Sequence, residues 1–381
     1  MSQEIYMEEL LQLVFDKDAS DLHIAAGVPP MIRVGGKLAP TDYEPLNADE
    51  TQKLIFSILT NEQRKTLEQT WELDCSYGVI GLGRFRVNVY KDKGAYAAAL
   101  RTIASKIPRF DELGLPPIVK ELIKKPRGLI LVTGPTGSGK STTLASMIDL
   151  INTNQSEHIL TIEDPIEYLH TSKKSLVNQR ELGEDTRSFA NALKASLRED
   201  PDIILVGEMR DLETIQLALT AAETGHLVFG TLHTSSASQT VDRIVDVFPP
   251  HQQMQTRVQL SNSLVGVMSQ TLLPRTGGAG DPLAKGRGRV MAMEVMMVTP
   301  AIANLIREGK TAQMYSAIQT GAKYGMQTLE MALKELCLSR QIRFEDAIGK
   351  TSRPEDFQRL MSETGAGATA AMKSGGGYAG R

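Results

Sequence analysis

The feature that most constrains the fold of this chain is a glycine-rich loop that directly follows a short apolar run. Residues 128–144 read GLILVTGPTGSGKSTTL, and from Gly134 onward they fit every fixed position of the phosphate-binding pattern G-x-x-x-x-G-K-[ST]. In that pattern a strand leads into a tight turn, whose bare N–H groups and following helix N-terminus attract phosphate oxygens. The alternative is a chance glycine turn between a core strand and a core helix, which the flanking apolar and helix-compatible residues disfavour.

The residues of this loop have expected roles in binding ATP. Lys140 should reach the β- and γ-phosphates, and the hydroxyl of Ser141 should ligate Mg²⁺. The residues expected to surround the nucleotide phosphates are Gly134, Pro135, Thr136, Gly137, Ser138, Gly139, Lys140, Ser141 and Thr142. ATP and Mg²⁺ are therefore the expected cofactors.

Length and composition limit the class of protein and its partners. With 381 residues, of which 41% are hydrophobic and 23% charged, the chain is typical of a globular protein of about two or three domains. Its net charge is −3 and it has no long basic block, which disfavours nucleic acid as a partner. No apolar stretch approaches the roughly 18 residues that span a bilayer. The acidic residues 1–18 do not suit a signal peptide, so we expect a cytoplasmic protein.

Two domains and a tail are expected from the pattern of apolar residues. Residues 1–114 mix helical spacing with alternating strands, and one long helix is predicted over 48–68. Residues 107–126 are rich in proline and form the predicted linker. Residues 115–363 alternate strands and helices, which is the sequence form of a mainly parallel α/β sheet. The glycine- and alanine-rich residues 364–381 are expected to be disordered.

The expected elements of the second domain follow one another in a regular order. Strands are predicted after the loop over 158–162, 203–206, 227–232 and 289–295. Later helices are predicted over 252–273, 300–308 and 326–338, with a glycine-rich loop over 277–288. The helix after the first of these strands is expected to begin at Asp185 or Thr186, and the next one at Asp211.

Carboxylates follow two of the predicted strands at the point where each strand ends. In α/β sheets, ligands bind at the carboxyl ends of the parallel strands. Glu163 comes directly after the run 159–162, and Glu208 follows the run 203–206. Either glutamate can belong to the Mg²⁺ shell or polarise the attacking water. Capping of the next helix is the competing explanation, and it suits Asp211 better than either glutamate.

Histidines flank the third of these strands. His226 precedes the run 227–232 and His233 follows it. A lone histidine is usually a structural residue, but His233 stands at the strand end where the nucleotide is expected. The pattern alone supports a phosphate-sensing role and a structural role for His233 about equally.

The strand predicted over 84–90 carries arginines on one face. Its alternation places Arg84 and Arg86 on the same side, and Arg101, after a strand over 95–100, is a candidate to join them. A solvated polar face is the simpler interpretation. The alternative is a set of cations directed at a bound nucleotide, as arginine fingers are.

Four motifs in this order resemble those of the secretion-superfamily ATPases. They are the phosphate loop at 134–141, ILTIEDPIEY at 159–168, DPDIILVGEMRD at 200–211 and AAETGHLVFGTLHT at 221–234. Within this family the chain most resembles the retraction ATPases of type IV pili, because the N-terminal segments ASDLHIAAGVPPMIRVGGKL and RFRVNVY also match. The resemblance covers about residues 5–360.

The resemblance implies a fold and an assembly. The fold is a PAS-like N-terminal α+β domain followed by a RecA-like P-loop ATPase domain with a helical C-terminal region. The assembly is a homohexamer that contacts a platform protein of the inner membrane at the pilus base, and a paralogous retraction ATPase is a further partner. The protein would be cytoplasmic, peripheral to the membrane only through its partners, and would couple ATP hydrolysis to pilus retraction and twitching motility.

The resemblance also implies residue roles that the spacing left open. Glu163 would be the general base for water, and Glu208 would be the Walker B acid near Mg²⁺. The residues that it assigns to reading the nucleotide state or to closing on the phosphates are His226, His233, Arg84, Arg86 and Arg101.

Two departures from the family pattern bear on the function. The family's retraction-associated helix usually reads AIRNLIRE, whereas residues 301–308 read AIANLIRE, with Ala303 in place of the arginine. This leaves an accessory retraction ATPase as the alternative function, beside a nucleotide-regulated scaffold at the pilus base. The cysteine-rich zinc insertion of the related extension ATPases is missing, which argues against an extension role.

Overall fold

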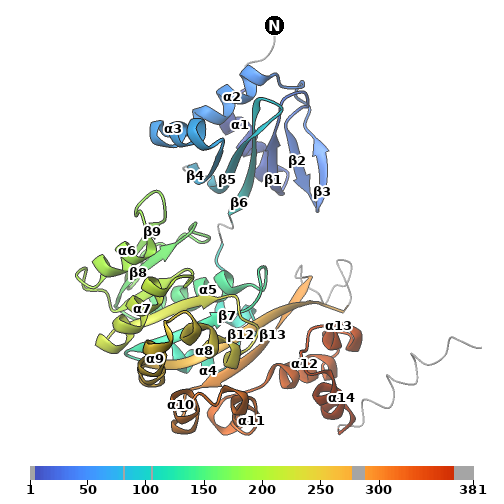
Figure 1. The fold of residues 1–381 in the computed structure, drawn as a ribbon. Coiled ribbons are helices and arrows are strands. Elements are labelled where there is room, and N and C mark those ends of the chain that lie inside the picture. The colour runs from blue at the N-terminus through green and yellow to red at the C-terminus, as the bar shows by residue number, and fades with distance from the viewer. Residues whose placement is uncertain (1–4, 80–81, 104–105, 277–287, 364–381) are drawn as a thin grey trace, which may run out of the picture. The chain divides into compact units, whose positions relative to one another are not determined.

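The computed structural model describes residues 5–79, 82–103, 106–276 and 288–363 (Figure 1). The chain separates into two compact units, which we describe one at a time. Unit 1 comprises Met1–Ile107 with Pro165–Leu169, and unit 2 comprises Pro108–Asp164 and His170–Arg381. The domain limits expected at 114 and 115 stay a prediction. The expected disordered tail and nearly all of the expected glycine-rich loop lie outside the described residues.

Unit 1 is built on a six-stranded antiparallel sheet with the strand order β3-β2-β1-β6-β5-β4. Its elements are α1 (Met7–Asp16), β1 (Ala19–Ile24), β2 (Met31–Val34), β3 (Lys37–Pro40), α2 (Ala48–Ser57), α3 (Asn61–Thr70), β4 (Glu72–Val79), β5 (Gly83–Asp92) and β6 (Ala95–Ile103). The apolar side chains of β5 that alternate with the arginines, Phe85, Val87 and Val89, are fully buried in its core. The alternation predicted for this strand is therefore confirmed.

The single helix predicted over 48–68 is wrong, because the structure has two helices there. Helix α2 ends at Ser57, and Thr60 is the N-cap of α3. The hydroxyl of Thr60 accepts a hydrogen bond from the N–H of Gln63 at 3.2 Å. The side chain of Gln63 accepts in return from the N–H of Thr60 at 2.9 Å. This reciprocal pair supplies hydrogen-bond acceptors for two N–H groups that would bond to backbone carbonyls in a continuous helix. The capping box therefore starts a new helix within the predicted one.

Unit 2 is built on a seven-stranded sheet with the order β13-β12-β7-β11-β10-β8-β9. Its strands are β7 (Gly128–Thr133), β8 (His158–Glu163), β9 (Leu176–Glu181), β10 (Ile203–Val206), β11 (Leu227–Leu232), β12 (Leu264–Pro274) and β13 (Arg289–Met297). All neighbouring strands run parallel except β12 and β13. The predicted strands over 203–206 and 227–232 are confirmed to the residue, and the parallel α/β class is confirmed. Strand β9 was not predicted.

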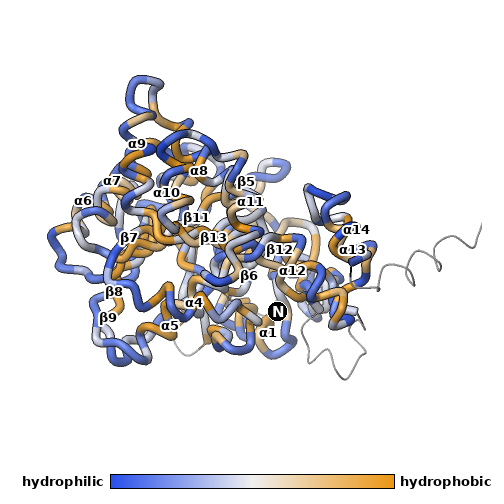
Figure 2. The backbone as a smooth tube through the Cα atoms, turned by 90° about the horizontal axis from the view of Figure 1, so that it is seen from below, coloured by the Kyte–Doolittle hydropathy of each residue, from blue (hydrophilic) through white to orange (hydrophobic). Residues whose placement is uncertain are grey.

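Helices cover both faces of this sheet. One face packs on α4 (Ile118–Leu122) and α5 (Lys140–Asn154). The other face packs on α6 (Phe189–Ser196), α7 (Leu212–Thr224), α8 (Ala237–Asp246), α9 (Pro250–Ser263), α10 (Pro300–Arg307) and α11 (Met314–Gln319). Because both faces are covered, the central strands β7 and β11 are buried along their length and mostly apolar, and the hydrophobic colour gathers around them in Figure 2.

The helix predicted over 252–273 is wrong in its second half. Helix α9 ends at Ser263, and the chain continues directly as strand β12. This strand pairs in parallel with β7 and antiparallel with β13, so sheet pairing on both sides overrides the helical spacing. A strand buried on both faces lacks the alternation that would have distinguished it from a helix in the sequence.

Two helix starts also differ from their predictions. Helix α6 begins after Ser188, whose hydroxyl accepts from the N–H of Asn191 at 3.0 Å, so neither Asp185 nor Thr186 is its cap. The cap predicted at Asp211 is confirmed, because its carboxylate accepts from the N–H of Thr214 at 2.8 Å.

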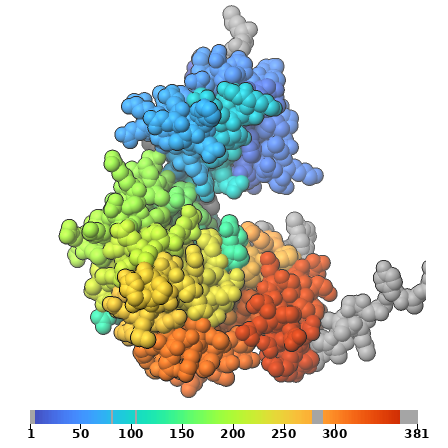
Figure 3. Space-filling view, viewed as in Figure 1, coloured from blue at the N-terminus to red at the C-terminus, as the bar shows by residue number. Residues whose placement is uncertain are grey.

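The C-terminal helices form a separate lobe of unit 2, drawn in red in Figure 3. The lobe consists of α12 (Leu329–Leu338), α13 (Phe344–Ile348) and α14 (Pro354–Ser362), which share a small core around Phe357. The helix predicted over 300–308 corresponds to α10, whose Ile302 and Ile306 are fully buried and whose Ala303 is half-buried. None of the described helices is long and apolar enough to cross a membrane.

A buried carboxylate joins this lobe to the sheet. Glu294 of β13 accepts a hydrogen bond from the N–H of Ala237 at the start of α8, at 2.7 Å, and another from the backbone of Leu329 at the start of α12. Burial, helped by the neighbouring Glu330 and opposed by the backbone hydrogen bonds and Arg353, raises the pKa of Glu294 to about 7. One side chain thus contacts the first turns of two helices.

Candidate functional site

The glycine loop lies between β7 and α5, as the sequence predicted. Gly134 has φ +145° and Gly139 has φ +88°, a region that favours glycine. A Cβ atom on Gly134 would lie 2.3 Å from the carbonyl oxygen of Gln270 and 2.6 Å from Oγ of Ser138. The first glycine of the pattern is therefore required by close packing as well as by its backbone conformation.

The polar groups of the loop suit a phosphate. Lys140 Nζ donates to the carbonyl oxygens of Gly134 and Pro135 at 2.9 and 3.3 Å, which places its charge against the loop. Oγ of Ser138 is buried and has no hydrogen-bond partner among the described residues. A buried hydroxyl without a partner costs free energy. The loop thus presents a cation, a hydroxyl and the N-terminus of α5 together, which is the donor set that phosphate oxygens need.

Strand β12 supports the loop from the side, and this support was missed because the region was predicted to be helical. Gln270 Nε2 donates to the carbonyl oxygen of Ser138 at 2.7 Å, and both groups are buried. The hydroxyls of Thr133 and Ser269 lie 2.7 Å apart in the same two strands. Gln270 therefore holds the phosphate loop in place, although no motif marks it in the sequence.

The sheet order brings the other candidate residues to the same edge as the loop. Counting from the loop after β7, the adjacent parallel strands are β11, β10 and β8, which lead to His233, Glu208 and Glu163. Neighbouring strands lie about 4.8 Å apart, so these side chains follow one another along one edge. The structure thus brings together residues that are up to about 100 positions apart in the sequence.

Glu208 has cationic or hydrogen-bonding partners on both oxygens. His233 Nε2 lies 3.0 Å from Oε1, and the Arg210 guanidinium donates to Oε2 at 2.6 Å. Burial raises the pKa of Glu208, but the hydrogen bonds and charges of Arg210 and His233 outweigh it, and the net effect lowers the pKa. Glu208 is therefore ionised at neutral pH, the state required of a metal ligand.

Glu163 is held by donors from two strands. Its Oε1 accepts from Oγ1 of Thr161 at 2.7 Å and from Nε2 of Gln179 at 3.1 Å. A Cβ atom on Gly207 would lie 3.1 Å from Cα and 3.6 Å from Cγ of Glu163, so the glycine before Glu208 leaves room for the other glutamate. The two glutamates stand at the ends of β8 and β10, which pair directly in parallel.

His226 lies at the other end of strand β11 from His233. It precedes β11, whereas His233 follows it, and a strand of this length spans about 20 Å. Its Nδ1 lies 3.0 Å from the carbonyl oxygen of Ala221 in its own helix–strand turn. The two histidines therefore stand at opposite edges of the sheet, and only His233 adjoins the loop edge.

The three candidate arginines lie in unit 1, and each has a partner in its own sheet. Arg84 donates to the hydroxyl of Ser76, and Arg86 pairs with Asp74 at 2.7 Å across β4 and β5. Arg101 pairs with Asp21 at 2.8 Å across β6 and β1, where the two residues are in register. These partners could not be assigned from the sequence, because they depend on strand register.

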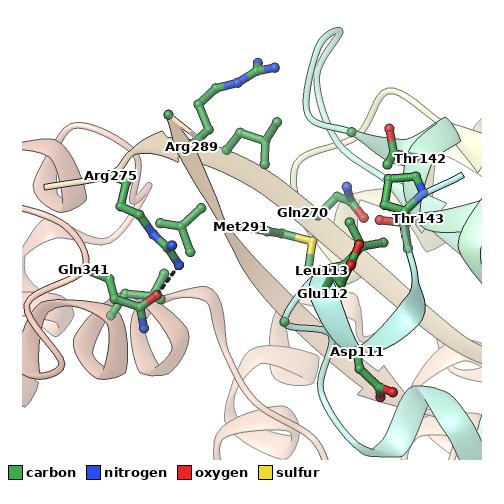
Figure 4. A pocket seen from close by; sticks show the side chains of 17 residues that line it. Asp111, Glu112, Leu113, Thr142, Thr143, Gln270, Arg275, Arg289, Met291 and Gln341 are labelled. Carbon is green, nitrogen blue, oxygen red and sulfur yellow. Dashed lines mark hydrogen bonds between the residues drawn. The ribbon is translucent and has the colours of Figure 1, made fainter. Parts of the chain in front are cut away.

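A cavity of about 660 Å³ opens beside the helix that follows the loop. Thr142, Thr143 and Gln270 line it on one side, and Arg275, Arg289 and Gln341 line it on the other (Figure 4). Arg275 donates to Oε1 of Gln341 at 2.8 Å, which fixes part of the far wall. This cavity could not be predicted from the sequence, because its walls combine residues 108–114, the start of α5, β12, β13 and the C-terminal lobe.

The described residues contain no group of three or more histidine, cysteine, aspartate or glutamate side chains that could hold a metal ion.

Comparison with known proteins gives the family. Residues 98–347 match the model of the family described as type II/IV secretion system protein. The type IV pilus retraction ATPase PilT of Pseudomonas aeruginosa is 56% identical over 92% of this chain and 99% of its own length. The type IV pilus ATPase PilU of the same organism is 39% identical over 94% and 91%.

A solved structure agrees with these relatives. The crystal structure of the pilus retraction motor PilT with bound ADP matches with a TM-score of 0.86 and 51% identity, over 93% of this chain and 100% of that one. The expected fold of an N-terminal domain followed by a RecA-like ATPase domain is confirmed. The chain therefore belongs to the type II/IV secretion system protein family, in the branch that contains PilT.

Proposed function

We propose that this protein is an ATPase motor that drives the retraction of type IV pili. The observation that carries the proposal is the phosphate loop with Glu208 and Glu163 along one sheet edge, in a chain that is 56% identical to a retraction ATPase. Binding alone would need only the loop. The added carboxylates are the groups that hydrolysis requires.

The residues have distinct roles in this proposal. The loop would hold the phosphates, with Lys140 against their charge and the 660 Å³ cavity beside Thr142 taking the nucleoside. Ser141 and ionised Glu208 would hold Mg²⁺, which neutralises charge on the phosphates when bound. Glu163 would orient the attacking water and accept its proton. His233 would report the occupancy of the site through its contact with Glu208.

We further propose a homohexameric ring in the cytoplasm, attached to the inner membrane through a platform protein at the pilus base. The family resemblance supports this assembly. An accessory role like that of PilU is the second candidate, and Ala303 in α10 is the observation that favours it. The higher identity to PilT than to PilU, 56% against 39%, favours the main retraction role.

Replacing Glu163 by glutamine tests the enzymatic role. The amide keeps the size of the side chain but accepts no proton, so turnover should fall about 10² to 10⁴-fold while ATP affinity stays nearly unchanged. Phosphate release by the purified hexamer and retraction in cells that have no other retraction ATPase are the two measurements. Wild-type turnover in Glu163→Gln would remove Glu163 from the mechanism. Fast turnover by the wild type without retraction would favour the accessory role.

The arginines of unit 1 are proposed to act on the phosphates, and Arg86 allows the clearest test. Its ion pair with Asp74 is half exposed on both sides, 51% and 49%, and exposed pairs contribute only about 0–1 kcal/mol. A phosphate can therefore replace Asp74 as the partner of Arg86. Arg86→Ala should reduce turnover about 10³-fold or more, as loss of an arginine finger does.

Asp74→Asn is the matched control for this variant. It breaks the same ion pair but leaves the guanidinium in place, so its turnover should remain close to that of the wild type. If both variants turned over ATP as fast as the wild type, Arg86 would serve only in the ion pair with Asp74.

A further inference from the structure

Gln179 lies beside Glu163 on one face of the sheet in unit 2. The register of the parallel strands β8 and β9 places Thr161 opposite Gln179, and Glu163 follows Thr161 by two residues. Side chains alternate along a strand, so all three belong to the same face. Ile159 and Val177, which share this alternation, pack in the core that includes α5, the helix that begins at Lys140.

Hydrogen bonds fix which group Gln179 presents to the glutamate. The N–H of His170 donates to Oε1 of Gln179 at 2.7 Å, and an N–H can only donate. The amide oxygen is therefore turned toward His170, and the NH₂ group is turned toward Glu163. There it donates to Oε1 at 3.1 Å, the same oxygen that accepts from Thr161 at 2.7 Å.

We infer that Gln179 is a positioning residue for ATP hydrolysis, which holds Oε1 of Glu163 so that the carboxylate keeps the orientation in which it activates water. This inference rests on the proposed role of Glu163 as the base. Two donors on one oxygen restrict rotation of the carboxylate, and a hydrogen bond donated to a carboxylate stabilises its ionised form. Both effects favour a base that has to be ionised and aligned before the reaction.

His170, the residue that anchors Gln179, adds no positive charge beside it. Burial lowers the pKa of His170 to about 4, so its ring is neutral at neutral pH. The anchor is its backbone N–H, which does not change with pH. The orientation of the Gln179 amide is therefore held by a group that does not titrate.

Gln179→Glu is the variant that isolates this contact. The new side chain still accepts from the N–H of His170, but a carboxylate oxygen replaces the NH₂ group that faces Glu163. With Mg·ATP, kcat at pH 7 should fall about 10- to 100-fold, the usual effect of losing a hydrogen bond to a charged group. The acid limb of the kcat profile should move up by about one pH unit, because two adjacent carboxylates share a proton. ATP affinity should not change.

Asn178→Asp is the matched control. It makes the same amide-to-acid change on the next residue of β9, whose side chain faces the other side of the sheet and contacts Nε2 of His158 at 2.9 Å. Its kcat and its pH profile should remain those of the wild type. In the double variant Glu163→Gln with Gln179→Glu, turnover should be no slower than in Glu163→Gln alone, because the group that Gln179 positions is already lost.

The outcomes separate this inference from the proposed function. Slow turnover in Glu163→Gln would support the base. If the pH profile of Gln179→Glu were then unshifted, or the losses in the double variant were additive, the role of Gln179 would be overturned and the role of Glu163 would stand. A profile shift in Asn178→Asp equal to that in Gln179→Glu would overturn it as well. Wild-type turnover in Glu163→Gln would overturn the proposed base, and the role of Gln179 with it.

Discussion

Two buried carboxylates, Asp21 in unit 1 and Glu294 in unit 2, have similar exposure but pKa values that move in opposite directions. Asp21 is 6% exposed and Glu294 is 5% exposed. Burial raises the pKa of Asp21, but hydrogen bonds from Ser20 and Arg101 and the charge of Arg101 outweigh it and lower the pKa. For Glu294, burial dominates and raises the pKa to about 7. Glu294 lies deeper among protein atoms than Asp21, and its partners do not offset that burial, whereas the partners of Asp21 do.

The difference follows from how each unit is built. In unit 1, cross-strand pairing places a guanidinium opposite Asp21, and the two residues are in register. In unit 2, Glu294 meets the N–H groups that begin two helices, and its charged neighbours are another carboxylate, Glu330, and Arg353. Glu330 is itself held by the hydroxyls of Thr351 and Tyr315 at 2.6 and 3.2 Å. The surroundings of Asp21 therefore stabilise an anion, whereas those of Glu294 stabilise the protonated acid.

The largest expected effect concerns Glu294 and pH. In the folded chain this group keeps its proton up to about pH 7, whereas its ordinary pKa is 4.5, so the folded state binds more protons between these values. Stability should therefore fall as pH rises through that window, by roughly 2–3 kcal/mol between pH 5 and pH 8. Denaturant unfolding of the wild type should show this decline, and Glu294→Gln should lack it because the amide has no proton to lose.

An exposed glutamate of α12 provides the control for this measurement. Glu335→Gln removes an equal charge without touching the buried cluster, so its stability should fall with pH as in the wild type. The same decline in wild type and Glu294→Gln would mean that Glu294 is ionised when folded, and the contrast with Asp21 would disappear.

A smaller effect is expected from Arg101→Ala in unit 1. The side chain of Asp21 is only 8% exposed and would lose one of its charged partners, at a cost of about 1–2 kcal/mol at pH 7. Because the pKa of Asp21 is lowered when folded, its stabilisation is present above the ordinary value of 3.8 and is lost as pH falls through the lower, folded value. In the variant this loss should occur at higher pH.

Arg33→Ala is the matched control for Arg101→Ala. Arg33 Nε lies 3.6 Å from Asp21, beyond hydrogen-bond distance, so its removal should cost less than that of Arg101. Equal losses in the two variants would show that Asp21 responds to nearby charge in general and not to its register partner.

Much of the candidate site could be predicted from the sequence because each part of it is local. The loop from Gly134 to Ser141 and the residues Glu163, Glu208 and His233 all stand at or just after the ends of apolar runs that form strands. Parallel pairing then brings those strand ends together, as it does in α/β sheets generally. The family resemblance grouped His226 with these residues, whereas the structure places it before β11, at the opposite edge of the sheet.

The parts that could not be predicted depend on contacts between distant strands. Gln270 supports the loop from a strand that was predicted as helix, and Gln179 lies on β9, which was not predicted at all. Asp74 became the partner of Arg86 only through the register of β4 and β5. Such residues have no motif, because their function comes from the strand that lies beside them.

The support that β12 gives to the phosphate loop has a consequence for how the protein is made. Gln270 contacts Ser138 across 132 positions of the chain. At about 5–20 residues per second, the ribosome adds Gln270 roughly 7 to 26 s after the loop has been synthesised. Until then the loop lacks this hydrogen bond and the strand that supplies it. We therefore expect nucleotide to stabilise chains that contain β12 more than products truncated before it.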